Sequence, residues 1–278
     1  EFHVNTPLRS ADFWVVYAGL FDTEHCFCSP DRTLFVTYEP SSVHRYEPAF
    51  LAQFAQVLTC QRRIEHPQVR YRPQGQQWFA GLTWPELDVT EDYDSFSAMP
   101  PPQKKALISL VSSRKVMTRE HERRLKAVER LQLTFGDLLD VYGDGFRRVS
   151  DKLSAILPYK YHVVLENSQE RDYWSEKLAD AYLGWSFPLY WGCPNLSEYL
   201  PDASFEALPC DLYDGMARSI QSVLDDDPYM DRLNAIAEAR RRVLNEQSFF
   251  GVVTAMLRTM AVRPAAAAQP LLIHDERR

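Results

Sequence analysis

The second half of the chain alternates short apolar runs with stretches whose apolar residues recur at helical spacing. Five runs rich in β-branched and aromatic residues are typical of strands, at 106–113, 137–143, 160–167, 187–192 and 204–208. Helical spacing joins Met117, His121, Leu125 and Val128, and again Trp174, Leu178, Ala181, Tyr182 and Trp185. Further helices are expected over 196–200, 212–225 and 229–260. Because strands alternate with helices, we predict a parallel sheet with right-handed crossovers.

The first half of the chain is also mixed. We expect strands within 12–20, 33–40 and 77–81 and a helix over 47–57. The sharpest change in composition is SAMPPPQKK, at 97–105, because three successive prolines cannot lie within a helix or a central strand. We therefore predict an α/β protein whose domains are 1–98 and 106–260, joined by a linker at 99–105. The low-complexity segment 261–278 is expected to be a flexible tail.

Composition narrows the classes of ligand. The chain has 31 Lys and Arg against 38 Asp and Glu, a net charge of −7, which disfavours general nucleic-acid binding. Only 10 of its 278 residues are glycine, and no GxGxxG or GxxxxGK[ST] motif is present. Rossmann dinucleotide fingerprints and P-loops are thereby excluded. If this protein binds a nucleotide, its side chains must hold the phosphates.

Other kinds of site have little support in the sequence. No zinc-ligand spacing is found among the five cysteines, which are Cys26, Cys28, Cys60, Cys193 and Cys210. We expect free, mostly buried thiols in a reducing compartment, the bacterial cytoplasm, with a membrane-peripheral location as the alternative. The longest apolar run, 13–21, is too short to span a bilayer. Asp92–Asp94 and Asp225–Asp227 resemble the metal-binding DxD of some sugar transferases, but solvated acidic loops explain both. His162 lies in an apolar run and is expected to be a core residue.

The predicted parallel sheet of the second domain indicates where a ligand would bind. Ligands of such sheets bind at the carboxyl ends of the strands. There, Ser175 is a plausible N-cap, which places Glu176 and Lys177 in the first turn of a helix. A helix N-terminus favours anions, and Lys177 adds a full charge, to which Arg119 could add a second from the neighbouring helix. Two such cations could bind a diphosphate, although both could equally be solvated surface charges.

One segment of this second domain carries a family resemblance. Residues 159–205, YKYHVVLENSQERDYWSEKLADAYLGWSFPLYWGCPNLSEYLPDASF, resemble the characteristic segment of glycosyltransferase family 10, the α-1,3/4-fucosyltransferases. The tyrosine–lysine pair, ENS, the following tyrosine, EK and the FPLYWG strand are in register. SSRKVMTR, LDVYGDG and TLFVTYEP resemble weaker family features. The sequence departs from the family pattern at Leu165, where phenylalanine is usual, at Ser175, where threonine is usual, and at Glu170, Arg171 and Asp172, where glycines are frequent. The resemblance therefore implies the identities of the donor and acceptor less strongly than it implies the fold.

The resemblance implies the GT-B fold, in which two Rossmann-like domains face each other across a cleft, and a soluble bacterial type of enzyme. It implies inverting transfer of L-fucose from GDP-fucose to a hydroxyl of an oligosaccharide or glycoconjugate acceptor, by α-1,3/4 linkage to a GlcNAc-type unit. No metal is required, and a divalent ion is at most stimulatory. The implied donor-binding residues are Arg119, Asn167, Tyr173, Glu176 and Lys177, and Glu39 is the implied catalytic base. We expect the family's first strand to precede Glu1.

Two alternatives stay open. The chain could be a GT-B transferase that uses another nucleotide sugar, which the altered residues 170–172 would accommodate. It could also be a non-catalytic glycan- or nucleotide-binding module that kept the fold. Retention of Arg119, Glu176 and Lys177 argues against the module, because charged residues are costly to bury and a degenerate site would lose them.

Overall fold

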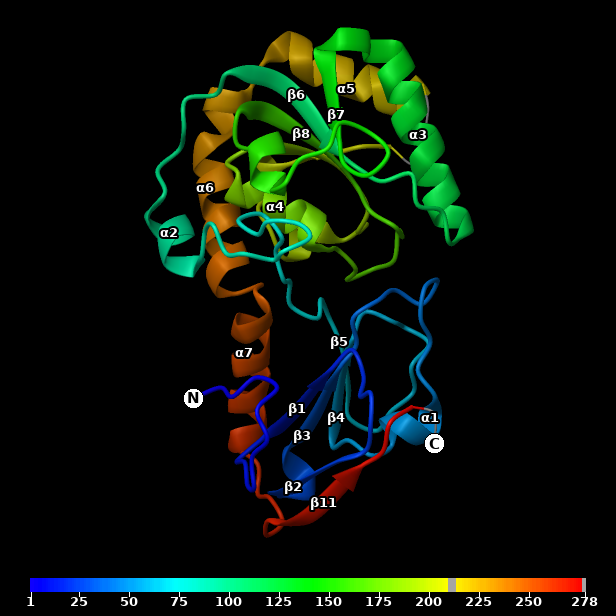
Figure 1. The fold of residues 1–278 in the computed structure, drawn as a ribbon, viewed down its shortest axis with the longest axis vertical. Coiled ribbons are helices and arrows are strands. Elements are labelled where there is room, and N and C mark those ends of the chain that lie inside the picture. Colours follow the sequence, from blue (N-terminus) through cyan, green and yellow to red (C-terminus); the bar gives the residue numbers. More distant parts are fainter. Residues whose placement is uncertain (210–213, 277–278) are drawn as a thin grey trace. The chain divides into compact units, whose positions relative to one another are not determined.

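The computed structural model describes residues 1–209 and 214–276, which form two compact units, each built around a parallel β-sheet (Figure 1). Unit 1 combines Glu1–Gln74 with Val252–Arg278, and unit 2 is Gly75–Gly251. The expected domain boundary at 98 therefore lies near residue 75 instead. The reason is packing: Ala80 and Phe96 are completely buried in the core of unit 2, so the segment before the prolines belongs to that unit.

Unit 1 contains a four-stranded parallel sheet in the order β1-β3-β4-β5. The strands of this sheet are β1 (Trp14–Tyr17), β3 (Thr33–Val36), β4 (Gln56–Thr59) and β5 (Val69–Tyr71), and the short helix α1 (Pro48–Leu51) lies between β3 and β4 in the sequence. Aromatic rings fill one face, since Phe35 has its ring centroid 5.0–5.1 Å from those of Tyr46, Phe50 and Phe54. Strand β3, buried throughout, is thus the centre of this core.

The helix expected over 47–57 is much shorter in the structure. Pro48 occupies the first turn of α1, which ends at Leu51, and strand β4 begins at Gln56. Phe50 and Phe54 do share a buried face, as the spacing predicted. Val57, however, belongs to the β-branched run that pairs with β3, so the apparent helical period joined residues of two different elements.

The segment expected to be a flexible tail contains an ordered strand. Strand β11 (Gln269–Ile273) pairs antiparallel with β2 (Glu24–Cys28), a strand that the sequence reading missed. Ile273 is 2% exposed and packs in the core of unit 1, whereas Leu272 is 55% exposed. The alanine-rich composition of the segment concealed this short alternation of outward and inward side chains.

Unit 2 contains a five-stranded parallel sheet in the order β10-β9-β8-β6-β7, as the alternating pattern predicted. Its strands are β6 (Ala106–Val111), β7 (Leu139–Tyr142), β8 (Tyr159–Leu165), β9 (Phe187–Trp191) and β10 (Glu206–Ala207). Its helices are α2 (Tyr93–Ala98), α3 (Arg119–Phe135), α4 (Glu176–Leu183), α5 (Asp214–Asp226) and α6 (Tyr229–Asn245). Helix α4 packs on β8 and β9 and against α6, so the start of α4 is held by the core.

Two further expectations for this unit need correction. Residues 77–81 form no strand, because the N–H groups of Phe79 and Ala80 donate to the side chain of Asp180 rather than to a neighbouring strand. The single helix expected over 229–260 is divided into α6 and α7 (Phe249–Ala261). The expected start of the preceding helix, at 212, lies outside the described residues.

Several minor predictions are confirmed within residues 1–209 and 214–276. Cys28, Cys60 and Cys193 are buried, Cys26 is partly exposed, and none of these four forms a disulfide, while Cys210 lies outside this range. His162 is a buried core residue that bonds Ser109 at 2.8 Å, and burial lowers its pKa to about 3. Among the helices of this range, none is both long enough and apolar enough to cross a bilayer.

Candidate functional site

The start of helix α4 is built around a buried carboxylate. Ser175 is the N-cap, as predicted, and its Oγ accepts from the backbone N–H of Lys177. Ser175 also donates twice to Glu166, from its backbone N–H at 2.8 Å and from its Oγ at 2.6 Å. Glu166 directly follows β8 and is completely buried. The carboxyl end of β8 and the first turn of α4 are thereby fixed together.

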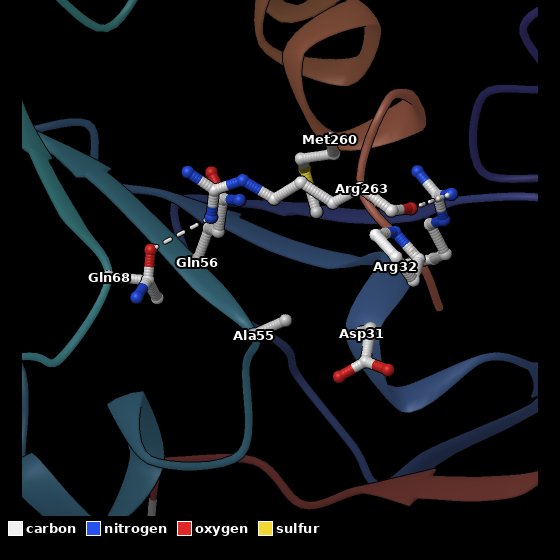
Figure 2. A pocket seen from close by; sticks show the side chains of 8 residues that line it. Asp31, Arg32, Ala55, Gln56, Gln68, Met260 and Arg263 are labelled. Atoms are coloured by element: carbon white, nitrogen blue, oxygen red, sulfur yellow. Dashed lines mark hydrogen bonds between the residues drawn. The ribbon is translucent and has the colours of Figure 1, made fainter. Parts of the chain in front are cut away.

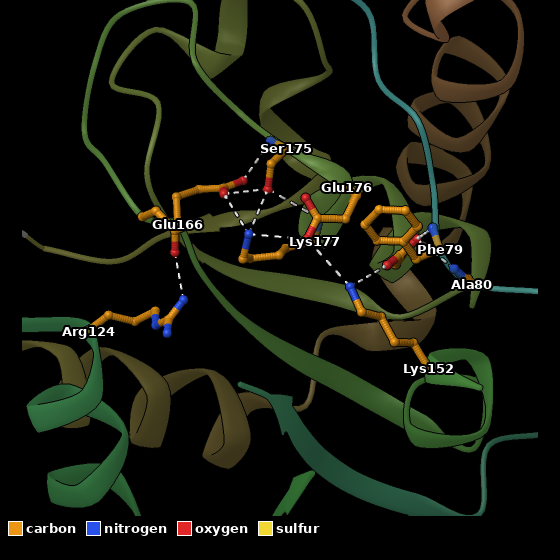
Figure 3. Close-up of polar contacts among 10 residues, drawn as sticks. Phe79, Ala80, Arg124, Lys152, Glu166, Ser175, Glu176 and Lys177 are labelled. Carbon is orange, nitrogen blue, oxygen red and sulfur yellow. Dashed lines mark hydrogen bonds and ion pairs between the residues drawn. The ribbon is translucent and has the colours of Figure 1, made fainter. Parts of the chain in front are cut away.

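Lys177 lies at the centre of this site. Its Nζ is 3.2 Å from Oε1 of Glu176, 3.1 Å from Oγ of Ser175 and 3.8 Å from Oε2 of Glu166. Figure 3 shows the ammonium of Lys177 between the carboxylates of Glu166 and Glu176. Burial alone would lower the pKa of Lys177, but Glu176 and Glu166 outweigh it and raise that pKa. The Lys177 side chain is 20% exposed, so its charged ammonium lies at the protein surface beside the N-terminus of α4.

The second cation of this cluster is Arg124, which the sequence reading missed. Arg124 is only 5% exposed, and its Nη1 donates to Oδ1 of Asn167 at 2.6 Å. Arg119, in contrast, is exposed at the start of α3. Burial lowers the pKa of Arg124, while the charges of Glu166, Glu176 and Tyr173 act in the opposite direction. The structure thus places Arg124 beside the predicted Asn167, Tyr173 and Glu176, and gives Arg119 no contact there.

A signal for Arg124 exists in the sequence. It stands on the same face of α3 as His121, Ala127, Val128 and Leu131, all of which are buried. An arginine within an apolar stripe needs polar partners, and here these are Asn167 and the carbonyls of Ser113 and Lys115.

The loop after β6 approaches the same region closely. Gly143 has φ +115°, and a Cβ on it would lie 1.9 Å from the carbonyl oxygen of Ser112. Only glycine permits this approach between the ends of β6 and β7. Oγ of Ser112 and Nε of Arg124 are both buried with no hydrogen-bond partner among the described residues. Unsatisfied buried polar atoms are costly, so both are candidates to contact a polar ligand.

A second layer of charge lies behind Glu176. Lys152 begins a short 3₁₀ helix (Lys152–Ala155), and its Nζ is 3.4 Å from Oε1 of Glu176 and 3.3 Å from Oδ2 of Asp180. Asp180 is 1% exposed and accepts the two N–H groups of Phe79 and Ala80. Asp180 lies on the same face of α4 as Glu176 and not on the apolar stripe of Leu178, Ala181 and Tyr182, so the helical spacing gives no signal for Asp180, and nothing in the sequence distinguishes Lys152.

The charges of this cluster balance. The carboxylates of Glu166, Glu176 and Asp180 face the cations of Arg124, Lys152 and Lys177, three against three. Two of these cations, Lys177 and Arg124, form one layer of the cluster together with Asn167 and Tyr173. Chemically, this layer can bind an anion with two positive charges and a helix N-terminus.

The altered segment 170–172 is firmly held. Asp172 is buried with φ +63°, and Oδ1 of Asp172 accepts from Asn195 at 2.8 Å and from the hydroxyl of Tyr199. Its neighbour Arg171 pairs with Glu198 at 2.7 Å. Tyr173, which follows, is buried. The segment is therefore a fixed turn that leads into α4.

Glu39 belongs to unit 1, unlike the other predicted site residues. It follows β3 by three residues and is partly buried. Its backbone carbonyl accepts from Nε2 of Gln61 at 2.9 Å. The position after the carboxyl end of a central parallel strand is one where active-site residues of α/β proteins lie.

The two acidic motifs have structural roles. Asp92 is the N-cap of α2 in a reciprocal capping box with Ser95. Asp227 pairs with Lys160 and accepts from the hydroxyl of Tyr161 at 2.8 Å. Across residues 1–209 and 214–276, no three His, Cys, Asp or Glu side chains gather in an arrangement that could hold a metal ion.

Unit 1 also contains a pocket of about 250 Å³ at the amino ends of β3 and β4 (Figure 2). Arg263 and Gln68 line it and are joined by a 3.0 Å hydrogen bond. Arg32, also in its wall, donates through Nη2 to the carbonyls of Ala261 and Arg263, where α7 ends. Arg32 therefore stabilises the end of α7, and the pocket lies at the strand ends opposite to those where ligands of parallel sheets bind.

Comparisons with known proteins concern mainly unit 2. Residues 101–229 match the sequence model described as glycosyltransferase family 10 (fucosyltransferase), C-terminal. A fucosyltransferase-like protein of Arabidopsis thaliana is 31% identical over 113 residues, which are 40% of this chain and 21% of that protein. The alpha-(1,3)-fucosyltransferase FucT of Helicobacter pylori is 35% identical over 57 residues, 20% of this chain and 12% of that protein. The chain thus spans only a small part of either relative.

The fold has a counterpart among solved structures. A crystal structure of alpha1,3-fucosyltransferase with GDP-fucose matches 92% of this chain and 80% of its own, with a TM-score of 0.52 and 14% identity. Together with the two parallel sheets, this likeness confirms the predicted α/β, GT-B fold class. Residues 101–229 of this chain are thus similar in sequence to the C-terminal domain of glycosyltransferase family 10, the fucosyltransferase family.

Proposed function

We propose that the chain transfers L-fucose from GDP-fucose to a hydroxyl of an oligosaccharide or glycoconjugate acceptor, by α-1,3/4 linkage to a GlcNAc-type unit. One observation carries the proposal. Within the segment that matches family 10, two largely buried cations lie near the start of α4. Lys177 is in the first turn of α4, and Arg124 donates a hydrogen bond to Asn167. A nucleotide diphosphate is the part of the donor that such a layer would recognise.

The donor would be bound by its phosphates. Lys177, Arg124 and the N-terminal dipole of α4 would offset the negative charge that builds on GDP as the sugar leaves. Asn167, Tyr173 and Glu176 would orient the phosphates, the ribose or the sugar. Arg119, exposed on the first turn of α3, would act as an outer cation at most.

The transfer step would be a direct displacement with inversion. The acceptor oxygen attacks C1 of fucose, the bond from C1 to the β-phosphate oxygen breaks, and its electron pair leaves with GDP. Glu39 would accept the proton of the acceptor hydroxyl. Lys177 and Arg124 would supply the charge stabilisation, so we propose that no metal ion is required. Transfer that continues in excess EDTA would support this part, and loss of transfer that Mg²⁺ or Mn²⁺ restores would contradict it.

Binding measurements with the full chain test the donor. Calorimetric titration with GDP, GDP-fucose, GDP-mannose and UDP-sugars should show binding of GDP and GDP-fucose and weaker binding of the others. Tighter binding of another nucleotide sugar would favour the alternative transferase, for which the fixed turn at 170–172 is the motivation. No binding of either GDP or GDP-fucose would contradict the proposal.

An acceptor screen tests the reaction. Incubation of the chain with GDP-fucose on a glycan array, followed by mass spectrometry, should reveal acceptors that gain one fucosyl unit. Donor binding with neither transfer nor hydrolysis would indicate the non-catalytic binding module instead. Products fucosylated on a unit other than GlcNAc would keep the reaction and correct the acceptor.

A further inference from the structure

We propose that Lys152 and Asp180 are positioning residues that hold Glu176 away from exclusive pairing with Lys177, and so leave Lys177 able to bind a diphosphate. This inference rests on the proposed function for its ligand. Its structural core, a chain of contacts from the backbone of residues 79–80 to Lys177, stands on the geometry of unit 2 alone.

Asp180 is the fixed end of this chain of contacts. Its Oδ1 accepts the N–H groups of Phe79 at 2.8 Å and Ala80 at 2.9 Å, and the side chain is almost fully buried. Asp180 stands four residues after Glu176 on α4, so both carboxylates lie on one face of the helix. With Oδ1 engaged by the backbone, Oδ2 is directed to Lys152.

Lys152 is held from three sides. Its Nζ contacts Oδ2 of Asp180 at 3.3 Å, Oε1 of Glu176 at 3.4 Å and lies 4.9 Å from the ring centroid of Phe79 (Figure 3). The preceding residue, Asp151, caps the 3₁₀ helix that Lys152 begins and also accepts the N–H of Gly81 at 3.1 Å. Burial alone would lower the pKa of Lys152, but Asp180 and Glu176 raise it, so this group is a permanent cation.

Glu176 is the shared partner. The same oxygen, Oε1, lies 3.4 Å from Nζ of Lys152 and 3.2 Å from Nζ of Lys177. If Lys152 lost its charge, Glu176 would pair with Lys177 alone. An incoming diphosphate would then have to compete with Glu176 for Lys177, in a partly buried place where charge interactions are strong. Lys152 therefore supports ligand binding without being in the layer that we assign to the ligand.

Four variants test this role. Lys152→Met removes the charge, Lys152→Gln keeps a donor towards Asp180, and Lys152→Arg keeps the charge. Lys126→Met is the matched control, because Lys126 pairs with Glu122 on the exposed face of α3. Thermal unfolding of each variant establishes that it is folded. Two readouts follow: the dissociation constant for GDP by calorimetry, and titration of the Glu176 carboxyl in the free protein by carbon-13 NMR.

We expect Lys152→Met and Lys152→Gln to weaken GDP binding about tenfold, a loss of about 1.4 kcal/mol. Lys152→Arg should restore binding, and Lys126→Met should have no effect. In the free protein, both uncharged variants should raise the pKa of the Glu176 carboxyl, which is about 2 with Lys152 in place. A purely structural role would lower the unfolding temperature without this titration change and without rescue by arginine.

The two readouts separate the inference from the proposed function. An unchanged Glu176 titration in Lys152→Met and Lys152→Gln overturns the positioning role, whatever GDP does. Normal GDP affinity in both variants, when the wild type binds GDP, also overturns it. If the wild type binds no GDP, the proposed function fails, and the titration alone decides whether Lys152 sets the state of Glu176.

Discussion

Nη1 of Arg124 lies 2.6 Å from Oδ1 of Asn167, which joins the middle of helix α3 to the turn that follows strand β8. The side-chain oxygen of Asn167 is thereby oriented by a buried cation. The sequence alone predicts Arg119 as the second cation of this site, but Arg119 stands five residues earlier and on an exposed face.

Substitution of the two arginines distinguishes these assignments. Arg124→Gln should weaken GDP binding about 10- to 100-fold, since a hydrogen bond to a charged group contributes about 1.5–3 kcal/mol. Arg119→Gln should change it less than about threefold, as expected of an exposed, screened charge. Calorimetry measures both, with Arg123→Gln on the exposed face of α3 as the control. A larger effect at Arg119 would restore the original assignment.

Replacement of Glu39 separates binding from chemistry. Glu39→Gln removes the proposed base but keeps the size of the side chain, so GDP affinity should be unchanged and the transfer rate should fall about 10²- to 10⁴-fold. The transfer rate is followed by mass spectrometry of the fucosylated acceptor found in the screen. An unchanged rate would exclude Glu39 as the base.

The buried carboxylate of Asp180 makes a prediction about stability. Asp180→Asn keeps an acceptor for the N–H groups of Phe79 and Ala80 but removes the charge that faces Lys152. We expect the free energy of unfolding to fall by about 2 kcal/mol, less than for a fully broken buried pair, because Lys152 keeps Glu176. Urea unfolding measures the change. Asp137→Asn, at an exposed position, is the control and should lie within about 0.5 kcal/mol of wild type.

The lowered pKa of Glu176 leads us to expect that the free energy of unfolding decreases in acid. Burial would raise its pKa, but Lys177 and Lys152 outweigh burial and lower it from 4.5 to about 2. Between these values the unfolded chain binds more protons than the folded one, so stability is complete above pH 4.5 and is lost as the pH falls towards 2. The contribution is at most about 3 kcal/mol. Unfolding of wild type and Glu176→Gln across this range should converge at low pH, and parallel curves would contradict the prediction.

Adjacent residues of β11 provide an internally controlled test of the C-terminal strand. Ile273 packs in the core of unit 1, whereas Leu272 faces outward. Ile273→Ala should lower the free energy of unfolding by about 2–4 kcal/mol, and Leu272→Ala by less than about 0.5 kcal/mol. Chemical unfolding followed by a probe in unit 1 measures both. Equal, small effects of the two substitutions would contradict the packed strand and would support the flexible tail that the composition indicates.

Local pattern predicted the sheet of unit 2 well. Strands β6 to β9 have strong apolar runs and lie where the sequence placed them, and the N-cap at Ser175 follows from its own residue type. Unit 1 was harder. Its strand β2 reads Glu-His-Cys-Phe-Cys, and it depends on pairing with β11, a strand near the other end of the chain in which Gln269 pairs with Cys28.

The site was predictable only where the motif is local. Glu176 and Lys177 follow from the start of one helix, and Asn167 from the end of the preceding strand. Arg124 and Lys152 come from two other segments, and only the fold brings them to Asn167 and Glu176; Asp180 is on α4 itself, but its partner Lys152 is distant in sequence. A charged residue on an apolar helix face was the one available signal, and it marks Arg124 but neither Asp180 nor Lys152.

The division of unit 1 between the two ends of the chain affects how the protein is made. During synthesis the whole of unit 2, residues 75–251, is made before strand β11. Until then the partner edge of β2 is uncovered and the place of Ile273 in the core is unfilled. Unpaired edges and exposed apolar surface favour aggregation of nascent chains. Unit 1 therefore becomes complete only after the whole of unit 2 has been synthesised.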